Sequence, residues 1–361
     1  MANRMVSARL GLAFAASMVI AACSSESEPA AAPTTASTTS MTTSTTTSAA
    51  TSTTIEILPA VPATGSTRDG SLTTDDGRTR TYRVYEPSQL PTSLVPLLLA
   101  LHGGTGSGRQ FERNSGFDEL AEANGFLAVY PDGTEIGAGV FARGRVWNGG
   151  ACCGPAARDN VDDVAFIAAL LDEIERDYSI DPARVFVAGH SNGGIMAYRL
   201  ACELSDRIAA IGLQAGWLGV DDCDPSRPVS VLHVHGTADE NAPIDGGIGE
   251  QGISGVAARP ALRSVTGLAS ADGCEPPPET TVDGDLTTSE FSACPDGVAV
   301  RLVAVRGASH AWMGHAATSP AVEALVGEPY LELDASAVIW AFLAQHPRAA
   351  SSSGESGQSS A

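Results

Sequence analysis

The sequence predicts an α/β fold, in which a mostly parallel central sheet is flanked by helices within a single domain. Short apolar runs such as 95–101 alternate with segments of helical spacing such as 161–177, an alternation typical of βαβ units. In addition, the apolar run 185–188 leads through Gly-His-Ser-Asn-Gly straight into a helical segment. Because ligands bind at the carboxyl ends of strands in such sheets, this turn is a candidate functional site.

The strands are predicted in order from alternation and from apolar runs. The first, 79–85, alternates and follows the turn signal Asp75-Asp76-Gly77. The second, 95–101, is apolar almost throughout, which suits a strand buried on both faces of a parallel sheet. Shorter apolar runs predict further strands at 126–130, 185–188, 208–213, 229–234 and 298–305.

Four helices are predicted between and after these strands. The segment 117–124 meets Gly125, a residue common just past helix C-termini. The segment 161–177 carries a broad apolar stripe that includes Leu170 and Ile174. The remaining helices are expected at 193–204 and 335–344.

The first 22 residues resemble a bacterial lipoprotein signal peptide. Arg4 and Arg9 precede a short apolar run at 10–20, and Ile20-Ala21-Ala22-Cys23 resembles a lipobox, in which the cysteine becomes the lipidated N-terminus. A plain secretory signal with an incidental cysteine is the alternative. We therefore expect an exported protein, lipid-anchored through Cys23 to the outer face of the cell membrane or secreted.

Low-complexity segments set the predicted domain boundaries. Between Thr34 and Thr54, 17 of 21 positions are Ser or Thr, and such a tract buries too little apolar surface to fold. The expected organisation is a disordered tether at 23–63, one folded domain at 64–348 and a disordered tail at 349–361.

The charge balance excludes several classes of protein. The net charge is −21, and all 21 basic residues are Arg. Nucleic-acid binding needs a basic face, and attraction to anionic lipid headgroups needs basic clusters. We therefore expect no nucleic-acid partner and membrane contact only through the lipid anchor. We also expect a monomer.

Six cysteines remain besides Cys23, and an even number in an exported chain favours disulfides, with 15 connectivities open. Proximity in sequence suggests pairing Cys274 with Cys294 and Cys202 with Cys223. Cys152 and Cys153 then form a vicinal disulfide or pair elsewhere. We expect neither metal nor cofactor, because the sequence has no CxxC and no histidine at ligand spacing from these cysteines.

The most specific motif is Gly-Xaa-Ser-Xaa-Gly at 189–193, between a predicted strand and a predicted helix. Small flanking residues permit a sharp turn that lifts the Ser191 hydroxyl above the sheet, next to a helix N-terminus with free N–H groups. The simpler interpretation is a tight turn with a surface serine. We predict that Ser191 is a nucleophile.

A serine nucleophile needs a general base and an acid that orients it, in the chain order Ser, acid, His for this arrangement. Asp239 lies just beyond the strand 229–234 and is the predicted acid, with Asp245 second. His310 follows the strand 298–305 and precedes the last helix, so it is the predicted base, with His315 as a competitor. Of the other histidines after Ser191, His235 is expected to be structural.

An oxyanion hole needs two N–H donors. One is the backbone of Asn192, directly after the nucleophile. The other is expected from the loop after the strand 95–101, where His102-Gly103-Gly104-Thr105 supplies Gly104 or Thr105, with Gly104 preferred.

Eight motifs occur in order between about residues 70 and 345: LHGG (101–104), YPDG (130–133), WNGGACCG (147–154), VDDVAF (161–166), GHSNGG (189–194), HGTAD (235–239), SHAW (309–312) and DASAVIWAF (334–342). With them the chain resembles the secreted α/β-hydrolases grouped as polyhydroxybutyrate depolymerase-type and feruloyl esterase-type esterases. The resemblance implies an α/β-hydrolase fold and serine esterase activity with Ser191, Asp239 and His310 as triad. One departure is Trp-Met-Gly-His at 312–315, where many relatives have Trp-Pro-Gly-Gly, which leaves the acyl preference open.

The resemblance leaves several substrates open: polyhydroxyalkanoate oligomers, or feruloyl and acetyl esters of plant polysaccharide. Trp147, Trp217 and Trp312 fall on loops at the predicted active face and are candidate aromatic platforms for a substrate, with packing as the alternative. Trp340, inside the last helix, is expected to be core.

Two competing functions remain open from the sequence. A peptidase of the prolyl-oligopeptidase type would share the fold, but no propeller repeat supports it. A non-catalytic surface lipoprotein that kept the fold is the other, and a complete Ser, Asp and His set argues against it.

Overall fold

The computed structural model describes residues 58–349 except 138 and 292. The predicted signal peptide, Cys23, the tether up to residue 57 and the tail from residue 350 lie outside the described residues. Residues 58–61 already contact the domain, because the Leu58 amide donates to Asn124 Oδ1 and the Val61 amide to the Glu119 carbonyl. Contact with the domain therefore begins before the predicted boundary at residue 64.

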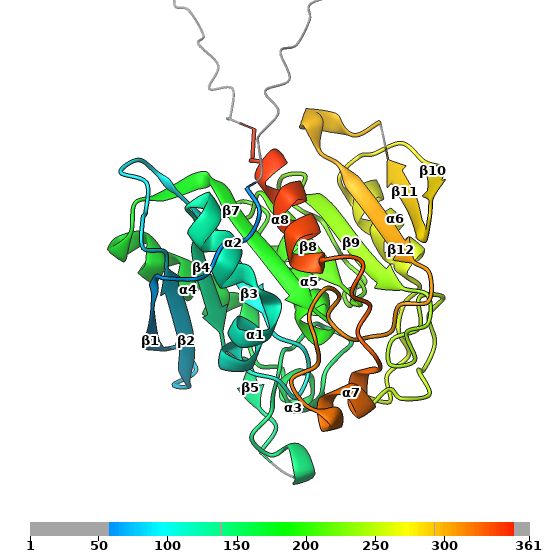
Figure 1. The fold of residues 1–361 in the computed structure, drawn as a ribbon, viewed down its shortest axis with the longest axis horizontal. Helices are drawn as coiled ribbons and strands as arrows, with labels where there is room; N and C mark the ends of the chain where they lie inside the picture. Colours follow the sequence, from blue (N-terminus) through cyan, green and yellow to red (C-terminus); the bar gives the residue numbers. More distant parts are fainter. Residues whose placement is uncertain (1–57, 138, 292, 350–361) are drawn as a thin grey trace, which may run out of the picture. The chain divides into compact units, whose positions relative to one another are not determined.

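Ten of the described strands form one sheet, in the order β1-β2-β4-β3-β7-β8-β9-β12-β11-β10 (Figure 1). The six strands from β4 to β12 in this order run parallel, whereas β1, β2, β11 and β10 pair antiparallel at the two sides. The bounds are β1 Ser66–Thr73, β2 Thr79–Glu86, β3 Val95–Leu101, β4 Leu127–Pro131, β7 Ile180–His190, β8 Ala210–Gln214, β9 Ser230–Gly236, β10 Glu279–Asp283, β11 Leu286–Phe291 and β12 Val300–Val305. This confirms the predicted α/β class with a mostly parallel sheet.

The apolar runs of the sequence form the centre of the sheet. Every residue of β3, β4, β8 and β9 is buried, as expected for strands covered on both faces. Each fully buried large apolar side chain there contributes roughly 1.5–3 kcal/mol to folding.

Helices cover both faces of the sheet (Figure 1). One core contains α4 (Asp163–Asp177), α5 (Asn192–Glu203) and α6 (Ala261–Ala271). The other contains α1 (Gly108–Ser115), α2 (Phe117–Asn124) and α8 (Ala335–Gln345). The shorter elements are β5 (Thr134–Glu135), β6 (Arg145–Val146), α3 (Gly154–Arg158), α7 (Pro320–Val326) and the 3₁₀ turns Gly139–Phe141 and Pro295–Gly297.

Packing within the second core confirms Trp340 as a core residue. Its ring is 3% exposed and stacks on Phe126 with centroids 3.8 Å apart.

Several elements of the structure are not predicted from the sequence, namely the edge strands and α1, α3, α6 and α7. Among the described helices, none combines the length and apolarity needed to cross a bilayer.

The six cysteines of the domain form three disulfides. Cys202 bonds to Cys223, Cys274 bonds to Cys294, and Cys152 bonds to its neighbour Cys153. These are the pairs suggested by proximity in sequence, with the adjacent cysteines as a vicinal disulfide. Disulfides of this kind persist in oxidising compartments outside the cytoplasm.

Candidate active site

A sharp turn between β7 and α5 presents Ser191. The residue has φ 53° and ψ −119°, in the positive-φ region that non-glycine residues rarely adopt. A Cβ on Gly189 would lie 2.4 Å from the Gly193 carbonyl oxygen, and one on Gly193 would lie 2.2 Å from the Leu101 carbonyl oxygen. The two glycines are therefore required, because strand and helix backbones approach too closely for any side chain.

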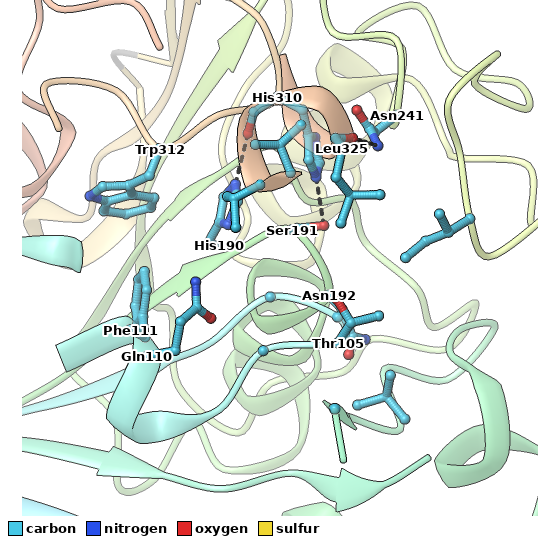
Figure 2. Close-up of a pocket in the computed structure, with 18 of the residues that line it drawn as sticks. Thr105, Gln110, Phe111, His190, Ser191, Asn192, Asn241, His310, Trp312 and Leu325 are labelled. Atoms are coloured by element: carbon cyan, nitrogen blue, oxygen red, sulfur yellow. Dashed lines mark hydrogen bonds between the residues drawn. The ribbon is translucent and has the colours of Figure 1, made fainter. Parts of the chain in front are cut away.

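Three residues from separate loops meet at this turn. His310 Nε2 lies 2.8 Å from Ser191 Oγ (Figure 2). His310 Nδ1 lies 2.7 Å from Asp239 Oδ2. Asp239 follows β9 and His310 follows β12, and these two strands are parallel neighbours in the sheet. The sheet therefore brings together the three side chains that the motifs singled out.

Asp239 is held as a carboxylate acceptor. Its Oδ1 accepts hydrogen bonds from the Asn241 and Ala242 amides at 2.9 and 2.8 Å. Burial by itself would raise the pKa of Asp239, but the neighbouring His310 and the hydrogen bonds from His235 and His310 outweigh it and hold that pKa well below its usual value. The carboxylate is thus ionised and fixed in orientation beside His310.

The runner-up residues lie elsewhere. Asp245 is exposed, and the carboxylate beside His310 Nδ1 is that of Asp239. His315 lines the same cavity as Ser191, but its Nε2 lies 3.5 Å from Asp334 Oδ1.

Two backbone amides near Ser191 are available as donors. Among the described residues, neither the Gly104 nor the Asn192 amide donates to a protein acceptor, whereas the Thr105 amide donates to the Arg145 carbonyl at 2.9 Å. A Cβ on Gly104 would lie 3.7 Å from Asn192 Cβ, so the two residues are adjacent. This arrangement favours Gly104 over Thr105 as the second oxyanion donor.

The Asn192 side chain contributes a feature that the sequence did not reveal. Its Oδ1 accepts from the Trp147 amide at 2.7 Å, and its Nδ2 donates to the Trp147 carbonyl at 3.0 Å. The side chain thus pairs with the backbone of a distant loop much as a neighbouring strand would. The pairing fixes the first turn of α5, where the free amide lies.

His190 is a second unforeseen residue of the site. Its Nε2–H donates to the His310 carbonyl at 2.9 Å, and its ring lies against those of His310 and Trp312 (Figure 2). Burial, and then the proximity of His310, lowers the pKa of His190 to about 3, so the ring is neutral. The only sequence signal for His190 is its position next to Ser191, because its hydrogen-bond partner lies 120 residues further along the chain.

A cavity of about 730 Å³ opens over Ser191. Trp217 and Trp312 line it, although only 6% and 8% of their surfaces are exposed. The prediction that Trp147 is an aromatic platform for the substrate is wrong, because the residue is completely buried. Its Nε1–H donates to the His102 carbonyl at 3.0 Å, and its ring packs beside His102.

In the part of the chain that the structure describes, no cluster of three His, Cys, Asp or Glu residues has the arrangement of a metal site.

Comparison with known proteins places these observations in a family. Residues 80–275 match the sequence profile of the family described as esterase PHB depolymerase. NocK of Nocardia uniformis subsp. tsuyamanensis, a protein assigned as an esterase, is 31% identical over 89% of this chain and 94% of its own length. Feruloyl esterase B of Piromyces equi is 31% identical in a match that covers 60% of this chain and 40% of that longer protein.

Among solved structures, the acetyl xylan esterase from Aspergillus awamori superposes with a TM-score of 0.51. It is 17% identical and covers 68% of this chain and 94% of its own. At that identity the likeness supports the fold alone.

Proposed function

The chain belongs to the esterase PHB depolymerase family, and from that premise we propose that it hydrolyses carboxylic esters with a Ser191–His310–Asp239 triad through an acyl-enzyme. The observation that carries this proposal is the unbroken line of hydrogen bonds from Ser191 Oγ through His310 to Asp239 beside the cavity. The alternatives of a peptidase and of a non-catalytic lipoprotein have no comparable observation in their favour.

Acylation begins with Ser191. Its Oγ attacks the ester carbonyl carbon while His310 Nε2 takes the hydroxyl proton, and Asp239 stabilises the resulting imidazolium. The amides of Gly104 and Asn192 donate to the oxyanion of the tetrahedral intermediate. Collapse of this intermediate breaks the ester C–O bond, and His310 returns the proton to the departing alcohol.

Deacylation repeats the same steps with water. A water molecule attacks the acyl carbon of the Ser191 ester while His310 takes its proton. The second intermediate releases the carboxylic acid, and the proton on His310 returns to Ser191 Oγ. The site is thereby restored without any cofactor in the proposed cycle.

For the substrate we propose feruloyl or acetyl esters of plant polysaccharide, or polyhydroxyalkanoate oligomers. The cavity volume suits an acyl group and part of the alcohol, and apolar and aromatic side chains such as Ile195, Trp217 and Phe111 line it. A panel of acyl chains from acetyl to octanoyl, with methyl ferulate and polyhydroxybutyrate oligomers, would rank these classes by kcat/KM.

The central test is Ser191→Ala. Loss of the nucleophile should lower kcat on p-nitrophenyl acetate by about 10⁴-fold or more, while Tm changes little. Ser270→Ala, which removes an exposed hydroxyl on α6, serves as the control and should keep wild-type kcat. Retention of most activity in Ser191→Ala would overturn the nucleophile assignment, and covalent labelling of Ser191 by a fluorophosphonate provides an independent readout.

We also propose that the domain is exported through residues 1–22 and anchored by lipid on Cys23, as the three disulfides of the domain and the lipobox-like motif support. Two acyl chains are enough for stable anchoring where one is marginal. Cys23→Ser should therefore release active enzyme into the medium. A Cys23→Ser protein that stays in the membrane fraction, or a wild type found entirely in the supernatant, contradicts the anchor.

A further inference from the structure

Strand β9 carries two buried histidines that the proposed mechanism does not use. His233 and His235 are two residues apart, so they lie on the same face of the strand, and they are 0% and 2% exposed. The helix α5, which begins at the nucleophile turn, contributes the buried Tyr198 to this face, and α6 also packs against β9. We call Tyr198, His233 and His235 the β9 network.

Hydrogen bonds connect the β9 network to the loop that carries Asp239. Tyr198 Oη lies 3.0 Å from His233 Nδ1, and His233 Nε2 lies 2.9 Å from His235 Nδ1. His235 Nε2 in turn lies 2.8 Å from the Ala242 carbonyl oxygen and 3.4 Å from Asp239 Oδ2. The network therefore runs from α5 to the acid of the triad.

These contacts admit one arrangement of protons when both rings are neutral. The Ala242 carbonyl can only accept, so His235 carries its proton on Nε2, and its Nδ1 must accept. His233 then donates from Nε2 and accepts at Nδ1. Tyr198 must therefore donate its O–H to His233.

Protonation of His235 would break this arrangement. Its Nδ1–H would face the Nε2–H of His233, so His233 would have to change tautomer and Tyr198 would lose its acceptor. Burial lowers the pKa of His233 well below its usual value, so this ring is neutral, and it raises the pKa of Tyr198 well above its usual value, so the hydroxyl keeps its proton. The donor hydroxyl at the far end of the network thus opposes a charge on His235.

A charge at His235 would matter because Asp239 is close. An imidazolium 3.4 Å from Asp239 Oδ2 would compete with His310 for the same oxygen. The titratable groups connected to His235 are His233 on its own strand, Tyr198 on α5 and Asp239 on the following loop, with His310 beyond the carboxylate. The helix α6 also packs against β9, and its buried residues, Ala261, Ser264, Val265, Leu268 and Ala269, do not titrate.

We propose that the β9 network positions the 239–242 loop. Tyr198 and His233 keep His235 neutral, so that His235 donates a hydrogen bond to this loop and the Asp239 carboxylate interacts with His310. The proposal rests on the proposed function, since it assumes that Asp239 and His310 are catalytic. In this account His235 is a positioning residue that acts through Asp239.

Proton positions can be read directly on the wild-type protein, folded and unmodified in sequence. In protein labelled with ¹⁵N-histidine, the ¹⁵N shifts of His233 and His235 should show protons on Nε2 and none on Nδ1, from about pH 5 to 8, the window where an ordinary histidine titrates. In Tyr198→Phe, where no hydroxyl donates to His233 Nδ1, a proton should appear on that nitrogen toward the acidic end of the window. A proton on Nδ1 of either wild-type ring overturns the proposal.

Kinetics test the consequence for catalysis. Tyr198→Phe should lower kcat about three- to tenfold, the effect of one hydrogen bond, with KM unchanged. The loss should be larger near pH 5.5 than near pH 8, because without the Tyr198 hydroxyl His233 Nδ1 is free to carry a proton. Tyr130→Phe is the matched control, because it removes a buried hydroxyl that donates to Asp118 on the other face of the sheet.

A second pair of variants separates donation from packing. His235→Gln keeps an N–H near the Nε2 position, whereas His235→Leu removes it, so kcat should fall in the order wild type, Gln, Leu. Equal kcat in Tyr198→Phe and Tyr130→Phe at both pH values overturns the proposal. Failure of the triad itself would appear instead as activity in Ser191→Ala, while the ¹⁵N measurement still decides the proton positions.

Discussion

At the scale of single residues, the geometry of Ser191 depends on glycines whose backbones touch other elements. Gly193, in the first turn of α5, lies next to the carbonyl of Leu101, the last residue of β3. The strand cannot move away, because β3 is buried between β4 and β7. The turn and the strand therefore fix one another.

Gly193→Ala should accordingly be far more damaging than its size suggests. A Cβ 2.2 Å from a backbone oxygen must displace β3 or α5, so we expect a loss of about 3 kcal/mol in unfolding free energy and more than tenfold in kcat. Urea unfolding and ester kinetics measure the two effects. Gly194→Ala is the control, since its Cβ would first meet the end of the Leu213 side chain at 3.2 Å; comparable losses in both variants would refute this account.

The sequence could predict those site residues whose place follows from their position after a predicted strand. Ser191 directly follows β7, whereas Asp239 and His310 lie on the short loops after β9 and β12. Parallel strand order therefore brings the three residues together. The contacts of His190 and Asn192 depend on partners far along the chain, which spacing does not encode. Trp147 was misjudged because a loop position says nothing about burial.

At the scale of elements, the sequence predicts the buried apolar strands but not the polar or exposed elements. β3 and β9 are apolar and buried along their whole length, so their sequences identify them. β10 is exposed at every residue and pairs only with β11 at the edge, so its sequence, Glu-Thr-Thr-Val-Asp, carries no such signal. Polar α1 and small-residue α6 were missed for the same reason: tertiary contacts, rather than composition, decide their conformation.

The C-terminus of α6 contains an acid in an unfavourable position. Asp272 is 3% exposed, and its Oδ2 has no hydrogen-bond partner within the described residues. Burial raises the pKa of Asp272 to about 7, even though its Oδ1 accepts from the Val229 amide. The carboxylate also meets the negative end of the helix dipole.

Asp272→Asn should therefore stabilise the protein in a pH-dependent way. The folded state holds the Asp272 proton more tightly than the unfolded state, so stability is highest below the unfolded pKa near 4 and falls as pH rises to about 7. Asn has no proton to lose, and we expect a gain on the order of 2 kcal/mol at pH 8 and little change at pH 4. Thermal unfolding at both pH values checks this, with exposed Asp222→Asn as the control; an equal gain at both would exclude a titration effect.

At the scale of the whole molecule, the disulfides differ in how much of the chain they constrain. Two of them join cysteines 21 and 20 residues apart, whereas the Cys152–Cys153 bond joins neighbours. A cross-link stabilises mainly by restricting the unfolded chain, and more so for longer loops. Their contributions to stability should therefore be unequal.

Replacing Cys202 and Cys223 together by Ala should lower the unfolding free energy by about 3 kcal/mol. Replacing Cys152 and Cys153 together should cost less stability but alter kcat/KM, because Cys153 lines the cavity over Ser191. Denaturant unfolding and the ester panel distinguish the two double variants. A larger stability loss from the vicinal pair would contradict the loop-length argument.

Exposed residues at the rim of the cavity are suitable positions for directed evolution. Three residues that line the cavity, Val140, Phe141 and Ile253, are nevertheless 94%, 38% and 53% exposed. Val140 and Phe141 belong to the 3₁₀ turn Gly139–Phe141 and Ile253 to a loop, so none of them lies on the sheet. Substitutions at such exposed positions usually change stability by less than about 0.5 kcal/mol. A combinatorial library at these three positions can therefore explore new acyl and alcohol groups without disturbing the strand ends that hold Ser191, Asp239 and His310, so that selectivity evolves separately from chemistry.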